Sequence, residues 1–419
     1  AYENLRFLCK NIGARLSGSD ASYKAVYWGE HLMRSYQFDN VFLQEVKVPV
    51  WKRGFGERLF IEDIGIVPVL ALGGSVATKD TLKAEIVEVR SFAEAESLDP
   101  ALVKDKILFF NEAMDQRFVN TFRAYGACAQ QRYAGARVAG QLGARAALVR
   151  SLAISTDRYP HTGSMGYEEG IPKVPGAAIG TEYAYKLSQL LDKGPVSGEL
   201  KLNCSSLPDT TSFNVIAEIK GTEHPEKFIL VGGHLDSWDV GEGAHDDGAG
   251  VIQALEAIRL FKQLGIKPRH TIRCVWYMNE ENGNMGGKTY AKVAKEKGWE
   301  HLAAIESDRG GFSPRGFDYD GDNQFQLEHF QSWKKLLEPY GLHQFQRGYS
   351  GVDIRPLRDN KIALFGLSPD SQRYFKLHHS AADVFEEVDK RELELGAAAM
   401  ASLVYLIDKY GFPTPITSD

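Results

Sequence analysis

The strongest constraint on the fold is a repeated order of strand, loop and helix that begins after Asn203. Apolar runs typical of strands occupy residues 213–219, 228–233, 271–278, 302–306 and 361–367, and helical patterns lie between them at about 248–263 and 288–297. Strands that alternate with helices predict an α/β fold with a doubly wound, mostly parallel sheet. In such a sheet, ligands bind in the crevice beyond the carboxyl ends of the strands.

The chain before Asn203 contains two stretches of different character. Residues 23–36 have apolar side chains at helical spacing, and residues 37–51 alternate as a strand does. We therefore assign residues 1–60 to the same domain as residues 203–419. Residues 61–202 consist of short β-rich runs around one Ala- and Gly-rich helical stretch at 119–142. A chain of 419 residues exceeds the ~250 residues that one core usually supports, so 61–202 is predicted to be an insert.

Composition excludes several classes of protein. A hydrophobic content of 43% with 25% charged residues is that of a soluble globular protein, and a formal charge of -6 argues against a nucleic-acid partner. No window approaches the ~18 apolar residues that a membrane span needs. Four cysteines are too few for a disulfide framework and leave the redox compartment open. Because the sequence starts at Ala1, an upstream signal was either removed or never present, and we favour a periplasmic or extracellular location.

Polar or acidic clusters follow three of the predicted strands. The run 228–233 leads to His234 and Asp236, the run 271–278 leads to Glu280 and Glu281, and the run 302–306 leads to Asp308. These side chains should converge at one edge of the sheet. Several carboxylates in one crevice raise one another's pKa unless cations neutralise them, so the pattern favours a metal site.

Further candidate ligands occur at the start of the next helix and near the C-terminus. They are Asp246, Asp247 and His379. Nitrogen and oxygen ligands of this kind suit zinc, and other divalent metals would fit them too. Asp246, Glu281 and Asp308 with one hydroxide carry four negative charges, which balance two divalent ions. The sequence therefore predicts two zinc ions.

The adjacent pair Glu280 and Glu281 is the most informative feature. Neighbouring residues of a strand point to opposite faces, so both can face one crevice only where the chain turns, as NEENGNMGG at 279–287 permits after Met278. One carboxylate can then bind metal while the other acts as a general base. A solvated acidic turn is the ordinary explanation of such a pair alone, but the buried strand before it and the neighbouring clusters favour a site.

Other catalytic signatures do not fit. The stretch GNMGGKT resembles a phosphate loop, but Asn282 stands where that loop needs glycine. Neither HExxH nor GxSxG is present, which argues against thermolysin-like proteases and nucleophile-elbow hydrolases. Cys274 lies within a predicted strand and is expected to be core rather than a nucleophile.

Four blocks together resemble a known family. They are GGHLDSWDVGEGAHDDGAG (232–250), NEENGNMGG (279–287), ESDRGGF (306–312) and HHSAAD (378–383). Their order and spacing are similar to those of the co-catalytic di-zinc exopeptidases of metallopeptidase family twenty-eight, and most similar to its plasma glutamate carboxypeptidase (carboxypeptidase Q) and aminopeptidase group. NIGARLSGSD at 11–20 resembles the amino-terminal part of the same group.

The resemblance implies a role for each matching residue. His234, Glu281, Asp308 and His379 would be terminal metal ligands, Asp246 would bridge the two ions, Glu280 would be the general base, and Asp236 would orient the imidazole of His234. It also implies a cis peptide bond between Asp246 and Asp247. The neighbouring His245 and His378 are not expected to bind metal.

Some assignments stay open within the resemblance. Tyr349 lies where some relatives place a tyrosine near the oxyanion, but GYSGVDIRPL departs from their SDH pattern, so a packing or substrate-wall role is equally compatible. Ser350 and Asp353 would shape the same loop, and Trp238 would line the pocket or an interface. The insert 61–202 resembles a protease-associated domain, which is expected to act as a lid without chemistry, His161 being the residue there most worth attention.

The resulting hypothesis is a metal-dependent exopeptidase that hydrolyses terminal bonds of dipeptides or short peptides. A water bridging two zinc ions would be deprotonated by Glu280 and would attack the carbonyl. The alternatives are a glutaminyl cyclase on the same fold, which would keep one zinc, and a non-catalytic receptor-like relative, which would have lost ligands. Bound metal distinguishes the three. A peptide is the expected partner, and exposed aromatic side chains could build a homodimer.

Overall fold

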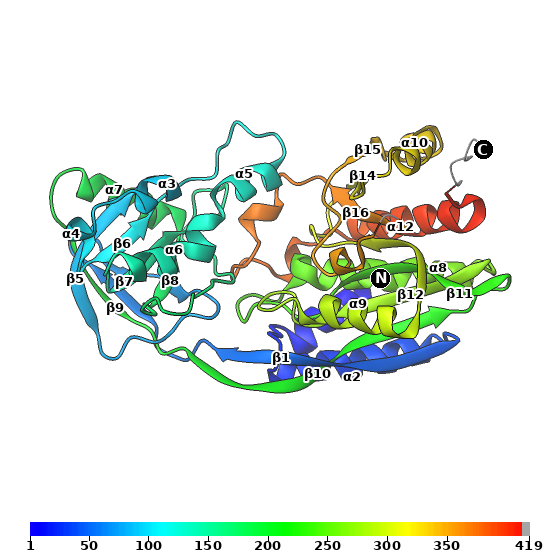
Figure 1. Ribbon diagram of the computed structural model, residues 1–419, viewed down its shortest axis with the longest axis horizontal. Coiled ribbons are helices and arrows are strands. Elements are labelled where there is room, and N and C mark those ends of the chain that lie inside the picture. The colour runs from blue at the N-terminus through cyan, green and yellow to red at the C-terminus, as the bar shows by residue number, and fades with distance from the viewer. Residues whose placement is uncertain (360, 413–419) are drawn as a thin grey trace. The chain divides into compact units, whose positions relative to one another are not determined.

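The computed structural model describes residues 1–359 and 361–412 (Figure 1). Contacts within the chain divide it into two compact units. The first unit comprises residues 1–48, 210–370 and the chain from 383 onward, and the second comprises residues 49–209 and 371–382. The second unit therefore contains all of 61–202 together with a short segment from the C-terminal part of the sequence.

The first unit is built on a mixed sheet. Its strands are β1 (Asn40–Lys52), β10 (Ser205–Ile219), β11 (His224–His234), β12 (His270–Tyr277), β13 (Glu300–Glu306), β14 (Pro314–Tyr319), β15 (Gln344–Arg347) and β16 (Ala363–Pro369). They lie in the order β1-β10-β12-β11-β13-β16-β14-β15. The central strands β12, β11, β13 and β16 are parallel, whereas β10 runs antiparallel to β12, and β14 runs antiparallel to β16 and parallel to β15. The predicted doubly wound α/β sheet is confirmed.

Helices cover both faces of this sheet. They include α1 (Tyr2–Phe7), α2 (Asp20–Ser35), α8 (Ala249–Gln263), α9 (Met285–Lys297), α10 (Gln324–Ser332), α11 (Lys334–Leu337) and α12 (Lys390–Tyr410). The larger apolar core joins α2, α8 and α12 to one face, and a smaller core joins α9 to the other. At Gly29 in α2 an added Cβ would lie 2.6 Å from the ring of Trp276, so glycine is what lets this helix approach β12.

The second unit has its own mixed sheet, in the order β3-β2-β9-β5-β6-β7-β8-β4. Its strands are β2 (Arg58–Ile61), β3 (Gly65–Val67), β4 (Val69–Ala71), β5 (Leu82–Val89), β6 (Ile107–Phe110), β7 (Ala146–Arg150), β8 (Gly176–Ile179) and β9 (Ser197–Lys201), and its helices are α3 (Phe92–Glu96), α4 (Pro100–Val103), α5 (Thr121–Cys128), α6 (Gln130–Gln141) and α7 (Thr181–Leu191). The helical stretch expected at 119–142 is thus two helices that meet at Ala129. Pro68, which lacks an amide hydrogen, separates β3 from β4.

The absence of a membrane span and the state of the cysteines were both predicted from the sequence. None of their helices combines the length and the apolar character needed to cross a bilayer. The four cysteines are free and buried, and Cys274 lies in the core of β12 as expected.

Candidate metal centre

The carboxyl ends of three adjacent strands meet at one edge of the first sheet. Strand β11 lies between β12 and β13, with His234 opposite Tyr277 and Gly232 opposite Glu306. His234 ends β11, while the turn with Glu280 and Glu281 follows β12 and Asp308 follows β13. The parallel register therefore brings the three acidic clusters of the sequence to one place.

The imidazole of His234 faces two carboxylates. Its Nε2 atom lies 3.2 Å from Oδ1 of Asp246 and 3.4 Å from Oδ1 of Asp308. Two ligands that each lie about 2.0–2.1 Å from one tetrahedral zinc ion are about 3.3–3.4 Å apart. Each of the two carboxylates thus lies at the distance from Nε2 of His234 that separates two ligands of one zinc ion.

Glu281 lies in a second group of possible ligands. One ligand atom each from His234, Asp246 and Glu281 lies within 4.8 Å of the others, and all three residues are buried. The backbone amide of Trp238 donates to Oε1 of Glu281 at 3.2 Å. Buried imidazole and carboxylate groups are the donor set that zinc prefers, so the residues present fit this metal.

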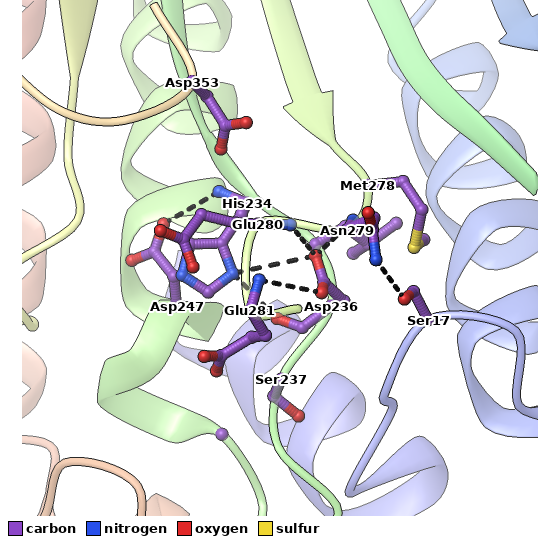
Figure 2. Close-up of polar contacts among 12 residues, drawn as sticks. Ser17, His234, Asp236, Ser237, Asp247, Met278, Asn279, Glu280, Glu281 and Asp353 are labelled. Atoms are coloured by element: carbon purple, nitrogen blue, oxygen red, sulfur yellow. Dashed lines mark hydrogen bonds and ion pairs between the residues drawn. The ribbon is translucent and has the colours of Figure 1, made fainter. Parts of the chain in front are cut away.

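Asp236 anchors the turn that carries the two glutamates. Its carboxylate accepts backbone hydrogen bonds from Asn279 at 2.7 Å, from Glu280 at 3.1 Å and from Glu281 at 3.3 Å. Figure 2 shows the hydrogen bonds from this turn as dashed lines that converge on the Asp236 carboxylate. Asn279 has a φ of 76°, a left-handed conformation that asparagine tolerates, and the chain turns there.

His234 is oriented by main-chain atoms as well as by acids. Its Nδ1 atom lies 2.9 Å from the carbonyl oxygen of Asp236, whereas the Asp236 carboxylate is 3.9 Å away. A ring N–H that donates to this carbonyl directs the other nitrogen, Nε2, toward Asp246 and Asp308. The expected link between Asp236 and His234 is therefore made by the backbone of Asp236.

Asp247 and Asp383 fix the segment that carries Asp246, and sequence reasoning gave neither this role. The Asp247 carboxylate accepts from the amides of His234 and Gly250, both at 3.0 Å. Asp383 accepts from the amides of His245 at 2.8 Å and Asp246 at 3.1 Å. The only sequence signal for Asp383 was its place at the end of the HHSAAD block. The peptide bond between Asp246 and Asp247 is cis, as the resemblance implied.

His245 has other contacts. Its ring stacks on Phe312 with centroids 4.2 Å apart, Nδ1 accepts from the Gly311 amide at 3.0 Å, and Nε2 lies 3.1 Å from the Glu387 carbonyl oxygen. Both ring nitrogens therefore bond to backbone groups. This arrangement is that of a structural histidine.

The electrostatics of the site are those of crowded, buried acids. Burial and then the charges of Asp308 and Glu281 raise the pKa of Glu280 well above its usual value, with His234 opposing them. Burial opposes protonation of His234, but the charges of Asp308 and Asp246 still raise its pKa well above the usual value. The acids thus stabilise a positive charge on the imidazole of His234. The same negative charges would attract a metal cation.

His378 and His379 belong to the second unit. There the amide of Thr162 donates to the His379 carbonyl at 2.9 Å, and Nδ1 of His379 lies 3.2 Å from the Thr162 carbonyl. Nδ1 of His161 lies 2.6 Å from the His378 carbonyl, and burial lowers the pKa of His161 to about 4. His161 and Thr162 therefore hold the backbone of the histidine pair. Metal binding by His379 stays a prediction.

Tyr349 and Asp353 lie on the loop before β16. Tyr349 is 41% exposed, and burial together with the charges of Glu306 and Asp308 raises the pKa of its phenol. Asp353 is buried, and Figure 2 shows its carboxylate directed toward the cluster that contains His234 and Glu280. Trp238 is also buried, at 2% exposure.

The chain is similar in sequence and in structure to known peptidases. The model of peptidase family M28 matches residues 214–404. Carboxypeptidase Q of Bos taurus is 35% identical over 410 residues, covering 97% of this chain and 85% of the relative, and the Homo sapiens protein is 34% identical over 412 residues with the same coverage. The chain belongs to peptidase family M28. A solved M28 peptidase precursor from Shewanella amazonensis superposes with a TM-score of 0.93 at 33% identity, covering 99% of this chain and 94% of that one.

More distant structures support the fold alone. The zinc aminopeptidase of Bacillus subtilis superposes with a TM-score of 0.68 at 20% identity, covering 96% of this chain and 93% of that one. M28 is a family of zinc peptidases, and the relatives that are 34–35% identical to this chain are carboxypeptidases. The chain is therefore a metallo-exopeptidase of family M28, as its sequence predicted.

Proposed function

We propose that this M28 peptidase hydrolyses dipeptides or short peptides at a centre of two zinc ions. The observation that carries the proposal is that Nε2 of His234 lies 3.2 Å from Oδ1 of Asp246 and 3.4 Å from Oδ1 of Asp308, each of which is the distance expected between two ligands that share a zinc ion. Asp246 would also serve the second ion, together with Glu281 and with His379, the fifth ligand that the family resemblance implies.

The protein's own groups divide the chemistry between them. Bound zinc, with a water between the two ions, would supply Lewis acidity that polarises the scissile carbonyl and lowers the pKa of water toward ~7. Glu280 would accept the proton of that water on its carboxylate and pass it to the leaving amine. Burial and the charges of Asp308 and Glu281 raise the pKa of the Glu280 carboxyl, which helps it to hold the transferred proton. Tyr349, whose phenol keeps its proton at neutral pH, would donate a hydrogen bond to the developing oxyanion.

The free α-amine of the substrate is the end that this site should recognise. The first unit presents several buried carboxylates around His234, and an ammonium group satisfies them better than an acetamide does. Leaving such acceptors without a partner costs about 1–3 kcal/mol each. Acetylating the amino terminus of a good dipeptide substrate should therefore reduce kcat/KM by roughly 5- to 150-fold, the range that corresponds to about 1–3 kcal/mol.

The decisive experiment combines metal content with a panel of dipeptides. We expect two zinc ions per chain, loss of turnover with a strong chelator and recovery with zinc. The panel contains each dipeptide free, amino-acetylated and carboxyl-amidated. Full activity of metal-free protein would refute the mechanism, and equal turnover of acetylated and free dipeptides would refute amine recognition. One zinc with release of pyroglutamate from an amino-terminal glutamine peptide would indicate the cyclase instead.

Two further assignments stay predictions from the sequence. They are a periplasmic or extracellular location and a homodimeric state. The protease-associated identity of residues 61–202 is likewise proposed from resemblance, supported by the β-rich sheet of the second unit.

A further inference from the structure

The side chain of Arg15 is completely buried in the first unit. Across residues 1–359 and 361–412, the hydrogen bonds of its guanidinium all go to main-chain carbonyl oxygens. Nε donates to Leu235 at 2.6 Å, Nη1 donates to Glu242 at 2.8 Å and to Gly13 at 3.4 Å, and Nη2 donates to Gly243 at 3.0 Å. A buried arginine that bonds only to carbonyls is unusual, because burying a charge is expensive unless its bonds are well placed.

The carbonyls that Arg15 binds belong mainly to one loop, residues 235–243. This loop joins His234 to the segment that carries Asp246. Leu235 follows His234 directly, and Gly243 precedes Asp246 by three residues, so the guanidinium bonds to both ends of the connection. The amide of Arg15 also donates to Oγ of Ser237 in the middle of the loop, at 3.2 Å. Arg15 therefore supplies the donors that the buried carbonyls of an irregular loop require.

Glycines in this segment leave room for the guanidinium. Gly243 has a φ of 57°, and a Cβ added there would lie 2.9 Å from Nη1 of Arg15 and 2.3 Å from Cβ of Ser237. A Cβ at Gly248 would lie 3.5 Å from Nη2. The loop backbone thus approaches Arg15 as closely as glycine permits, which is independent evidence that the two are fitted to each other.

The same short segment also reaches the second ligand loop. Nδ2 of Asn279 donates to Oγ of Ser17 at 2.6 Å, and the Ser17 hydroxyl donates to Oδ1 of Asn282 at 2.9 Å. Figure 2 shows Ser17 beside Asn279, the residue before Glu280. Residues 15–17 therefore contact two segments that adjoin proposed ligands, the loop 235–243 and the turn 279–282.

We propose that Arg15 is a positioning residue of the metal centre, which sets the separation of His234 and Asp246 by holding the loop between them. The proposal rests on the proposed zinc site. A planar guanidinium can reach carbonyls in several directions at once, whereas the ammonium of lysine is a point charge without that fork. Arg15→Lys should therefore keep the charge and lose the positioning.

The test measures zinc affinity by competition with a chromogenic chelator, and thermal unfolding of the metal-free protein. We expect Arg15→Lys to bind zinc 10- to 100-fold more weakly, the loss typical of groups that orient metal ligands. Arg273→Lys is the matched control. Arg273 is 3% exposed in the same unit but bonds to Glu218 and Tyr290, so its variant should lose thermal stability and keep the zinc affinity of the parent.

A pair of glycine variants keeps the proposal testable if Arg15→Lys does not fold. Gly243→Ala and Gly265→Ala both place a Cβ on a left-handed residue, with φ of 57° and 66°, but an added Cβ at Gly265 meets nothing within 4 Å. The two variants share the backbone penalty, and only the first pushes on Arg15 and Ser237. We expect at least tenfold weaker zinc binding for Gly243→Ala and parental binding for Gly265→Ala.

Each outcome separates this inference from the proposed function. A parent protein that binds no zinc would remove the metal centre itself. If the parent binds two ions and the Arg15 and Gly243 variants bind them as tightly as their controls do, the metal centre stands and the positioning role is wrong. Equal loss of zinc affinity in all four variants would also overturn it, because the effect would then follow stability alone.

Discussion

Asp236 holds the Glu280–Glu281 turn through three backbone hydrogen bonds, and Asp236→Asn tests that anchor with little change of shape. Two of the three amides, those of Asn279 and Glu280, donate to Oδ1, and the amide of Glu281 donates to Oδ2. An asparagine that keeps its oxygen toward the first pair must turn its NH₂ toward the Glu281 amide. Donor then faces donor at the residue that we propose as a metal ligand.

The magnitude follows from opposing effects. Losing a charge-assisted bond to the Glu281 amide removes about 1.5–3 kcal/mol, and the buried donors left there cost about 1–3 kcal/mol more. Against this, burial raises the pKa of Asp236, so its ionised form is itself costly and the neutral amide recovers part of the loss. We expect Asp236→Asn to lower the free energy of unfolding by about 2–3 kcal/mol, and to weaken zinc binding 10- to 100-fold.

The assay pairs urea unfolding of the metal-free protein with zinc titration, and hydrogen exchange reports on residues 279–281. Asp408→Asn is the control, because the buried Asp408 accepts from the amides of Arg269 and His270 at the amino end of β12. It should lose similar stability and keep its zinc affinity. Unchanged zinc binding in Asp236→Asn, or an equal loss in both variants, would show that the turn is positioned by something other than this carboxylate.

Two further predictions concern individual side chains. Glu280→Gln should keep two zinc ions and lose about 100-fold or more in kcat, while Glu281→Gln should lose one ion; metal analysis and kinetics on the same samples would reveal reversed roles. Burial lowers the pKa of His301 from 6.5 to about 4, so its neutral ring favours the folded state above pH 6.5. As the pH falls from 6.5 to 4, this contribution is lost, and the free energy of unfolding should decrease by up to about 3 kcal/mol. Urea unfolding of His301→Gln across that range should show a shallower loss, and an unchanged slope would contradict it.

The fold was predictable because its signals are local and repeated. Apolar runs that alternate with helical patterns indicate parallel strands wherever they occur, and the acids that follow residues 233, 278 and 306 could meet only at the shared edge of such a sheet. Boundaries that depend on contacts were not predictable. The helical stretch at 119–142 breaks at Ala129, and residues 371–382 belong with the second unit although the sequence offers no change of composition there.

The roles of the individual acids were harder to predict from the sequence than the fold was. The family resemblance implied that Asp236 orients His234, yet the Asp236 carboxylate accepts from the amides of the next loop and its backbone carbonyl contacts the imidazole. The roles of Arg15 and Asp383 depend on contacts that span more than 130 residues. A pattern within one segment carries no information about such partners, although both residues lie in blocks that resemble the family.

Adjacent Asp246 and Asp247 show why residue type alone cannot distinguish a metal ligand from a residue that supports the backbone of the site. Both oxygens of Asp247 accept hydrogen bonds from backbone amides, those of Gly250 and His234. The carboxylate therefore stabilises the conformation of the main chain. Asp246 instead directs Oδ1 at Nε2 of His234, while its own amide is held by Asp383. A carboxylate whose two oxygens accept bonds from amide donors has fewer lone pairs left for a cation than one that directs an oxygen at an imidazole nitrogen. The number of backbone donors on each acid, which only the fold determines, thus distinguishes the acids that build the site from those that would bind zinc.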